Sequence, residues 1–534
     1  MRLLGRIAVT AAIWTVVTMS NTIMAESKIG TAGPVRTLSG PVLGTTSSDG
    51  KIAIYRGIPY AAPPVGDLRW KDPQPVKPWK IVLIANNFGA SCMQELQRSR
   101  PPWTKEFMPQ NEDSEDCLSL NVWTPTTSPN KKLPVFFWIH GGGFSEGSSE
   151  VPVYEGTELA RTGMVVVSIN YRLGVFGFLA HPELTAESPH HSSGNYGLLD
   201  QVAALQWVKK NIQAFGGDPE NVTICGQSAG AASVHALIAT PLAKGLFQRG
   251  IAQSGNSLTG FPQSSLADGE KMGMAFAAAN GVHSLKELRA LSSEALMAAQ
   301  SRGAATIVRF PPVVDGWFYP EDPAQILAEG KQNDVPFMTG LMANDSGSLS
   351  GPPLPLEAFR KQVAERYGQM AADFLKLYPA GSEEEAVQSQ IESARDRGRV
   401  SIYLWVLRRA RTAKTSAYTY YFTHALPDPM HPEFGAFHTG EVPYLFRNLA
   451  IFDRPFKPVD YQVSDAISAY WKHFAETGNP NGTDLPKWTA TSAENTTTME
   501  IGDHGGQIPL ASPEKLRFWT SYFDSPISKN APIF

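Results

Sequence analysis

The strongest chemical signal in this 534-residue chain is the segment Gly226-Gln227-Ser228-Ala229-Gly230. It has the form G-x-S-x-G, and it lies between an apolar run of strand length, residues 222–225, and a helical pattern that begins at Ala231. A strand, a sharp turn and a helix in this order make a nucleophile elbow, whose tight turn requires small residues on both sides of the serine. The N-terminus of the helix favours negative charge developing beside that serine. The sequence predicts Ser228 as a nucleophile; the alternative is a turn serine without a chemical role.

A second segment, His140-Gly141-Gly142-Gly143-Phe144, follows the apolar run 135–139. Consecutive glycines leave backbone N–H groups unshielded, so that they can converge on a carbonyl oxygen. We assign an oxyanion hole to the N–H groups of Gly142, Gly143 and Ala229; losing one such donor costs about 3 kcal/mol in the transition state. The alternative is a phosphate-binding loop, but the segment lacks the Lys-Ser/Thr ending of a P-loop and the spacing of a dinucleotide fingerprint.

The surrounding pattern predicts the elements that position these loops. Residues 135–139, 164–169 and 222–225 are apolar on both faces, which suits central strands covered by helices on both sides. Between the second and third runs, apolar residues recur at helical spacing on one face: Leu198, Val202, Leu205, Val208, Ile212 and Phe215. Strand, helix and strand in this order indicate a mostly parallel α/β sheet.

Composition narrows the class of protein. Apolar residues make up 42% of the chain, which is enough for a large buried core, and the length alone suggests three or four domains. The formal net charge of −4 argues against a nucleic-acid binder that relies on bulk positive charge. Three cysteines exclude a disulfide-rich scaffold but leave room for one disulfide and one free thiol.

The first 25 residues are typical of a secretory signal peptide. Arg2 and Arg6 precede an uncharged, mostly apolar stretch at residues 7–19, and Ala25 ends a plausible cleavage site. The stretch is too short for a membrane span, although an uncleaved anchor helix is the alternative. We therefore expect a mature chain of residues 26–534, with no membrane span, a net charge near −6 and a secreted or periplasmic location.

In its order of motifs, the chain resembles the type-B carboxylesterases, the cholinesterase-like branch of the α/β hydrolases. Besides the two loops above, the resemblance rests on blocks that begin at Tyr55, Pro63, Leu68, Ser114, Leu120, Asn170, Gly194 and Phe215. It covers nearly all of residues 26–534. It implies an α/β-hydrolase fold, with a mixed, mainly parallel central sheet flanked by helices, in a single large catalytic domain rather than three or four.

The resemblance also implies the partners of Ser228. His438, in the segment from Gly435 to Phe446, matches the catalytic-histidine segment and follows the serine in the hydrolase order. The acid position falls on Asp345, where the family usually has Glu; its side chain is one methylene shorter, so its loop must lie closer to His438. The alternative is a turn aspartate, with the acid elsewhere. Ser254 matches a serine that supports the acid by hydrogen bonding.

The cysteines are assigned by the same resemblance. It pairs Cys92 with Cys117, bracketing a loop that overhangs the mouth of the active site, and leaves Cys225 as a buried, inert thiol. Apolar residues in the loop, among them Trp103 and Phe107, either line a gorge or simply pack the loop.

Together these parts predict hydrolysis of a small-molecule carboxylic ester through a covalent acyl-enzyme, without a metal or an organic cofactor. The substrate pocket is expected to include Phe144, Arg309 and Phe310. Arg309 either attracts an anionic, polycarboxylic acyl group of a natural product or toxin, or is a solvated arginine beside the pocket, which the sequence favours. A lipase acting at an interface and a non-catalytic cholinesterase-like binding module stay open as alternatives. We expect no nucleic-acid partner, and the oligomeric state is left open.

Overall fold

The three apolar runs form adjacent parallel strands, β9 (Leu133–Ile139), β10 (Val165–Ile169) and β11 (Gly217–Gln227), with β9 in the middle. In this computed structural model, successive residues of β9 alternate between two cores. Val135, Phe137 and Ile139 pack on one face of the sheet, and Phe136 and Trp138 pack on the other. The prediction of central strands covered on both sides is confirmed, because each face buries its own apolar set.

These strands belong to a sheet of eleven, in the order β18-β17-β16-β15-β12-β11-β9-β10-β8-β4-β3. The other members are β3 (Thr45–Thr46), β4 (Ile52–Pro59), β8 (Ser119–Pro125), β12 (Arg249–Gln253), β15 (Phe337–Met342), β16 (Ala417–Phe422), β17 (Thr497–Ile501) and β18 (Gly506–Pro509). Strands from β10 to β17 pair in parallel, and the pairs at both edges are antiparallel. The sheet is therefore mixed and mainly parallel, as expected.

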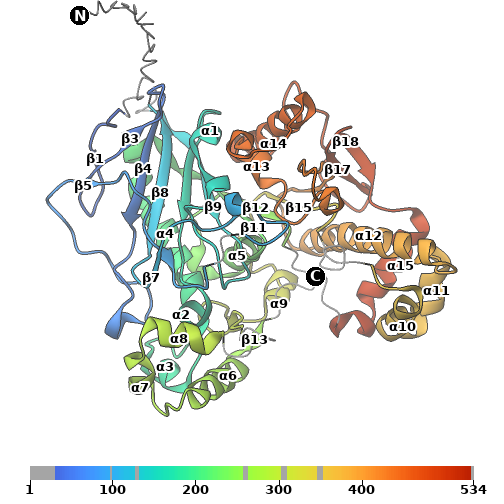
Figure 1. Ribbon diagram of the computed structural model, residues 1–534, viewed down its shortest axis with the longest axis horizontal. Coiled ribbons are helices and arrows are strands. Elements are labelled where there is room, and N and C mark those ends of the chain that lie inside the picture. The colour runs from blue at the N-terminus through green and yellow to red at the C-terminus, as the bar shows by residue number, and fades with distance from the viewer. Residues whose placement is uncertain are drawn as a thin grey trace, which may run out of the picture.

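Helices cover both faces of the sheet (Figure 1). On one face lie α4 (Tyr196–Asn211) and α5 (Ala229–Ala239), and on the other lie α13 (Val442–Leu445) and α14 (Pro458–Thr477). The expected amphipathic helix corresponds to α4 and a 3-10 turn, Ile212–Phe215, and all six of its apolar positions are buried.

Two groups of helices extend beyond the sheet. The first, at the bottom of Figure 1, includes α3 (Pro182–Glu187), α6 (Leu266–Ala279), α7 (Leu285–Ala290) and α8 (Ser293–Gln300). The second, at the right, includes α10 (Leu356–Tyr367), α11 (Ala371–Leu377), α12 (Glu383–Arg409) and α15 (Pro513–Asp524), which share a third apolar core. The remaining helices are α1 (Thr157–Ala160), α2 (Gly174–Phe178) and α9 (Pro323–Ala328).

The structure describes residues 30–96, 99–126, 131–255, 263–301, 309–345 and 353–530. The expected signal peptide, residues 1–25, lies outside these ranges. Within them, no helix is both long enough and apolar enough to span a bilayer.

Candidate active site

Ser228 occupies a strained turn between β11 and α5. Its φ of 58° and ψ of −121° lie where residues with a side chain are seldom found. A Cβ on Gly226 would lie 2.3 Å from the carbonyl oxygen of Gly230, and one on Gly230 would lie 2.1 Å from that of Ile139. The Ser228 N–H donates to the carbonyl of Gln253 at 2.9 Å, which ties the turn to β12. Both glycines of the motif are therefore required sterically.

The glycine loop after β9 lies against this turn. A Cβ on Gly141 would be 3.0 Å from the Ser228 Cβ, while Gly142 and Gly143 have φ values of 107° and 61°. Within the described residues, none of the N–H groups of Gly142, Gly143 and Ala229 has a hydrogen-bond acceptor. Three unpaired donors beside a serine form a geometry suited to binding an oxyanion.

A buried network holds the glycine loop in place. The His140 ring stacks on Tyr171 with centroids 4.5 Å apart, and its Nδ1 lies 2.8 Å from the Gly141 carbonyl. Burial lowers the pKa of His140 to about 4, so this ring is neutral at ordinary pH. The amide of Gln94 accepts from the Gly147 N–H and donates to the Gly147 carbonyl, both at 2.8 Å.

Asp345 and His438, 93 residues apart in the sequence, form a hydrogen bond between Oδ1 and Nδ1. A backbone bridge makes the contact: the Asn344 N–H donates to the Ala436 carbonyl at 2.9 Å, and Asn344 pairs with Phe437 as in a parallel ladder. This bridge draws the two loops together, so the shorter aspartate side chain reaches the ring. The other carboxylate oxygen of Asp345 accepts from the Met342 N–H at 3.1 Å.

The electrostatics of His438 favour its protonated form. Burial opposes charge on the ring, but the negative charge and hydrogen bond of Asp345 outweigh it, and the pKa of His438 is raised above its ordinary value.

Gln227 contacts the other nitrogen of the same ring. Its Nε2 lies 3.1 Å from His438 Nε2, and its side chain is buried. With Nδ1 donating to Asp345, Nε2 carries the lone pair, and the Gln227 N–H donates to it. The ring is thus held from both sides, and its Nε2 contacts the residue directly before Ser228. Sequence reasoning missed this contact, although the position directly before the nucleophile could have suggested it.

Ser254 does not make the expected hydrogen bond. Within the described residues its buried Oγ has no partner, while its N–H donates to the Gly340 carbonyl at 2.9 Å. The reason is its backbone conformation, with a φ of 53°, in a chain already tied to β15. Support for Asp345 comes from the Met342 N–H instead.

A second buried carboxyl group, missed by sequence reasoning, lies near this pair. Glu441 is completely buried; its Oε1 accepts from Gln253 Nε2 at 3.0 Å, and its Oε2 has no partner among the described residues. Burial and the neighbouring Asp345 charge raise the pKa of Glu441 to about 7. Gln253 also accepts from the Cys225 thiol and the Trp471 ring, and burial raises the pKa of that thiol, as expected for an inert cysteine.

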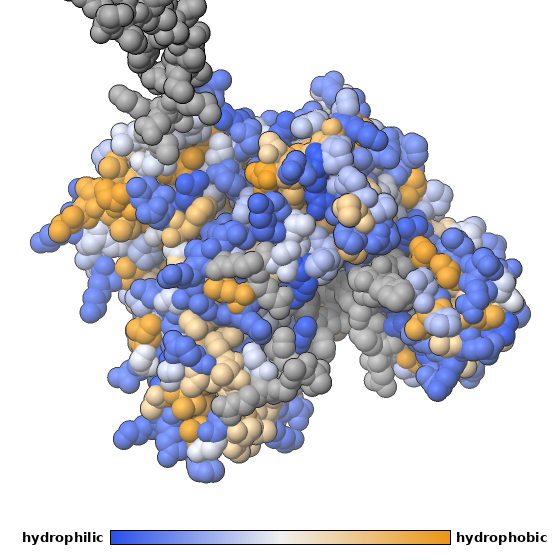
Figure 2. Space-filling model, in the orientation of Figure 1, coloured by the Kyte–Doolittle hydropathy of each residue, from blue (hydrophilic) through white to orange (hydrophobic). Residues whose placement is uncertain are grey.

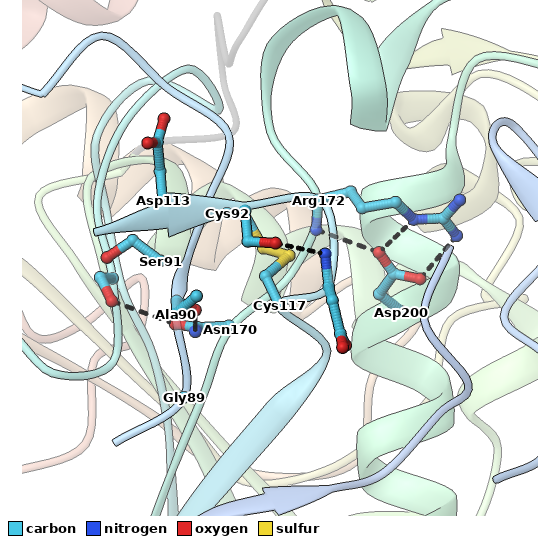
Figure 3. The surroundings of a disulfide bond; sticks show 12 residues. Gly89, Ala90, Ser91, Cys92, Asp113, Cys117, Asn170, Arg172 and Asp200 are labelled. Atoms are coloured by element: carbon cyan, nitrogen blue, oxygen red, sulfur yellow. Dashed lines mark hydrogen bonds and ion pairs between the residues drawn. A yellow bond between two sulfur atoms is a disulfide. The ribbon is translucent and has the colours of Figure 1, made fainter. Parts of the chain in front are cut away.

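The expected disulfide, Cys92–Cys117, is formed (Figure 3). Beside it lies the buried ion pair of Arg172 and Asp200, with a shortest separation of 2.7 Å. Within the bracketed loop, Trp103 donates from its ring nitrogen to Thr439 Oγ1 at 3.3 Å, and Phe107 packs edge-on against Phe437. The loop therefore packs directly against the residues that flank His438.

The three expected pocket residues have different surroundings. Phe144 and Phe310 are buried and pack against Phe178 and Phe276. Arg309 is exposed, and a Cβ on Gly143 would lie 3.6 Å from its Nη1, so the guanidinium lies beside the glycine loop. It forms no ion pair within the described residues. The residues directly before it, 302–308, lie outside those ranges.

No group of three or more His, Cys, Asp or Glu side chains in the described ranges is arranged to hold a metal ion.

Comparisons with known proteins show the family of the chain. The model of the carboxylesterase family matches residues 32–519. The chain is 36% identical to the para-nitrobenzyl esterase of Bacillus subtilis (strain 168), over 87% of this chain and 94% of the relative. It is 35% identical to a fumonisin B1 esterase of Sphingopyxis macrogoltabida, over 85% and 83%. The solved structure of a thermophilic PNB esterase superposes with a TM-score of 0.76, at 34% identity, covering 91% and 99% of the two chains.

Proposed function

This chain belongs to the carboxylesterase family and is a carboxylic ester hydrolase, and on that premise we propose that Ser228, His438 and Asp345 form its catalytic triad. Gly142, Gly143 and Ala229 supply the oxyanion hole. The observation that carries this proposal is the half-buried His438 ring, bonded to Asp345 through Nδ1 while Nε2 contacts Gln227, the residue directly before Ser228.

The proposed reaction has two halves. His438 Nε2 takes the proton of Ser228 as the hydroxyl oxygen attacks the ester carbonyl, and the three N–H groups stabilise the resulting oxyanion. The protonated ring then gives its proton to the leaving alcohol, which leaves an acyl-enzyme. A water molecule, deprotonated by the same nitrogen, releases the acid. Asp345 fixes the tautomer and stabilises the imidazolium in both halves.

Substitution of the serine tests the proposal most directly. Ser228→Ala should lower kcat at least 10⁴-fold toward a p-nitrophenyl ester while leaving the thermal unfolding temperature within a few degrees of wild type. The wild type, but not Ser228→Ala, should be labelled by a fluorophosphonate. Failure of the pure wild type to react would favour a non-catalytic binding module.

We further propose that the substrate carries an anionic acyl group that Arg309 attracts. Two observations support this substrate class: the guanidinium lies beside Gly143 without an ion-pair partner among the described residues, and one relative is named a fumonisin B1 esterase. A carboxylate on the acyl chain would meet a cation at the edge of the oxyanion hole.

The test compares two esters of one alcohol, a neutral butyrate and a succinate half-ester. Arg309→Gln should lower kcat/KM about five- to tenfold for the half-ester and less than twofold for the butyrate. Arg517→Gln, which changes an exposed arginine on α15, is the matched control. Equal responses of both esters to Arg309→Gln would contradict the anionic-acyl proposal without affecting the triad.

We also propose a secreted or periplasmic location, with residues 1–25 acting as a signal peptide. The disulfide supports an oxidising compartment. N-terminal sequencing of the exported protein should begin at Glu26, and an intact Met1 in the exported protein would contradict it.

A further inference from the structure

A small lobe on the N-terminal side of the sheet exposes an unusual set of apolar side chains. It consists of β1 (Val35–Arg36), β2 (Pro41–Leu43) and β5 (Leu83–Ile84), which form a three-stranded sheet of their own. Leu38, Ile81, Val82 and Ile84 expose 73%, 86%, 41% and 56% of their surface. Figure 2 shows the resulting apolar area at the upper left, over β1 and β5. We call these four residues the apolar tip.

The apolar tip is held in place by hydrogen bonds and packing. The Trp79 N–H donates to the Ser39 carbonyl at 2.7 Å, and its ring nitrogen donates to the Pro41 carbonyl at 3.0 Å. The ring occupies the space beside Gly40, where a Cβ would lie 2.3 Å from it. The Leu38 N–H donates to Asn211 Oδ1 at 2.7 Å, at the end of α4. Because the backbone is already ordered, a partner can cover the apolar tip at little cost in conformational entropy.

The charged side chains that the lobe itself carries have a single sign. Arg36, Lys77 and Lys80 are exposed beside it, and none of them forms an ion pair within the described residues. The two sequence segments that carry the strands of the lobe and its apolar tip, residues 35–43 and 77–84, contain no Asp or Glu, although the whole chain has a net charge of −4. The lobe is therefore a locally cationic, apolar surface on an acidic protein.

We propose that this lobe docks on a membrane surface that carries anionic lipids. Exposed aliphatic side chains bordered by lysine and arginine match the interface between acyl chains and anionic headgroups. A second copy of the chain fits less well. Two-fold symmetric association would bring the same patch together on both molecules, so that three cations would face three others with no carboxylate in either lobe.

The test measures how residues 26–534 partition onto vesicles, so that the lobe and not the leader is assayed. Vesicles of phosphatidylcholine alone are compared with vesicles containing 40% phosphatidylglycerol, at about 0.1 M salt. We expect wild-type protein to bind the anionic vesicles at least tenfold more tightly. The double variant K77E/K80E should lose at least tenfold on anionic vesicles, since each cation near such a surface contributes about fivefold. The triple variant L38S/I81S/I84S should lose binding to both types of vesicle.

Matched controls lie away from the lobe. Met430→Ser removes a side chain that is 80% exposed, and Lys487→Glu reverses an exposed charge; both should bind as wild type does. Hydrolysis of a water-soluble ester should be unchanged in every variant, which verifies folding. Absence of wild-type binding to anionic vesicles, or binding that survives both lobe variants, overturns the proposal. A concentration-dependent dimer that L38S/I81S/I84S abolishes would overturn it in favour of self-association.

Discussion

Two histidines after β16, the buried His424 and the half-buried His438, each bind aspartate, yet their surroundings differ. His438 bonds Asp345 through Nδ1, and its Nε2 faces the neutral amide of Gln227. His424 bonds carboxylates through both nitrogens, Asp503 through Nδ1 and Asp460 through Nε2 at 2.8 Å.

The difference lies in the second nitrogen. Carboxyl groups occupy both nitrogens of His424, so neither nitrogen of this ring is open to the proton of a hydroxyl group. His438 keeps a lone pair on Nε2 beside the nucleophile turn. An aspartate partner alone therefore does not make a histidine a base; the group facing the opposite nitrogen decides it.

The largest expected effect comes from a substitution that breaks the pair of Asp345 and His438. Asp345→Asn should lower kcat about 10³- to 10⁴-fold, because the amide can donate to Nδ1 and thus favours the wrong tautomer. Its free energy of unfolding should change much less than its activity. Steady-state kinetics and urea unfolding measure the two quantities; kcat close to wild type would remove Asp345 from the triad.

The corresponding change at the other histidine should affect stability. Asp460 accepts hydrogen bonds from His424, from the Tyr444 hydroxyl at 2.9 Å and from the Lys457 N–H at 2.7 Å. Asp460→Asn should therefore lower the free energy of unfolding by about 3 kcal/mol while kcat stays within about threefold, measured where both proteins are folded. A loss of kcat as large as that of Asp345→Asn would show that the two clusters are not separate.

Glu441 adds a carboxyl group near His438 that should make stability depend on pH. Its pKa of about 7 lies above the usual 4.5, so the folded protein binds the proton more tightly than the unfolded chain does. The stability that this provides is complete below pH 4.5 and is lost as pH rises through 7, a change of roughly 3 kcal/mol. Glu441→Gln should remove that dependence. Urea unfolding at pH 5 and pH 8 measures the free energy of unfolding of the wild type and of Glu441→Gln. If the two proteins differ by the same amount at both pH values, the raised pKa of Glu441 is contradicted.

The smallest expected effect concerns Gln227. Because the pKa of His438 is raised, the acid limb of kcat/KM should have its midpoint above pH 6.5. Gln227→Glu should move this midpoint up by about 1 unit, since a carboxylate stabilises the imidazolium, and Gln227→Met should move it less. If the two variants have identical profiles, the side chain does not act on His438 through its charge.

The sequence predicted most of the fold, and it identified the residues of the turn at Ser228 and of the glycine loop after β9. Runs apolar on both faces identified β9, β10 and β11, and the resemblance supplied the cysteine pairing and the sheet type. It did not predict the hydrogen bond of Ser254 correctly, because that depends on how the chain after β12 is tied to β15. Sequence reasoning also missed the contacts of Gln227 and Glu441. Gln227 contacts His438, in a loop more than 200 residues away in the sequence, and Glu441 accepts a hydrogen bond from Gln253 on β12.

What the sequence determined by itself was local: the strained turn at Ser228 and the glycine loop at Gly142 and Gly143. Gly226 and Gly142 are required there by carbonyl oxygens only four positions away, those of Gly230 and Glu146, which any chain with that sequence must meet. Only the tertiary structure decided that Asp345 meets His438, because a backbone bridge between Asn344 and Phe437 closes the gap that the shorter carboxylate would leave. The bridge forms where two loops distant in the sequence pack together, and a contact of that kind depends on the whole fold.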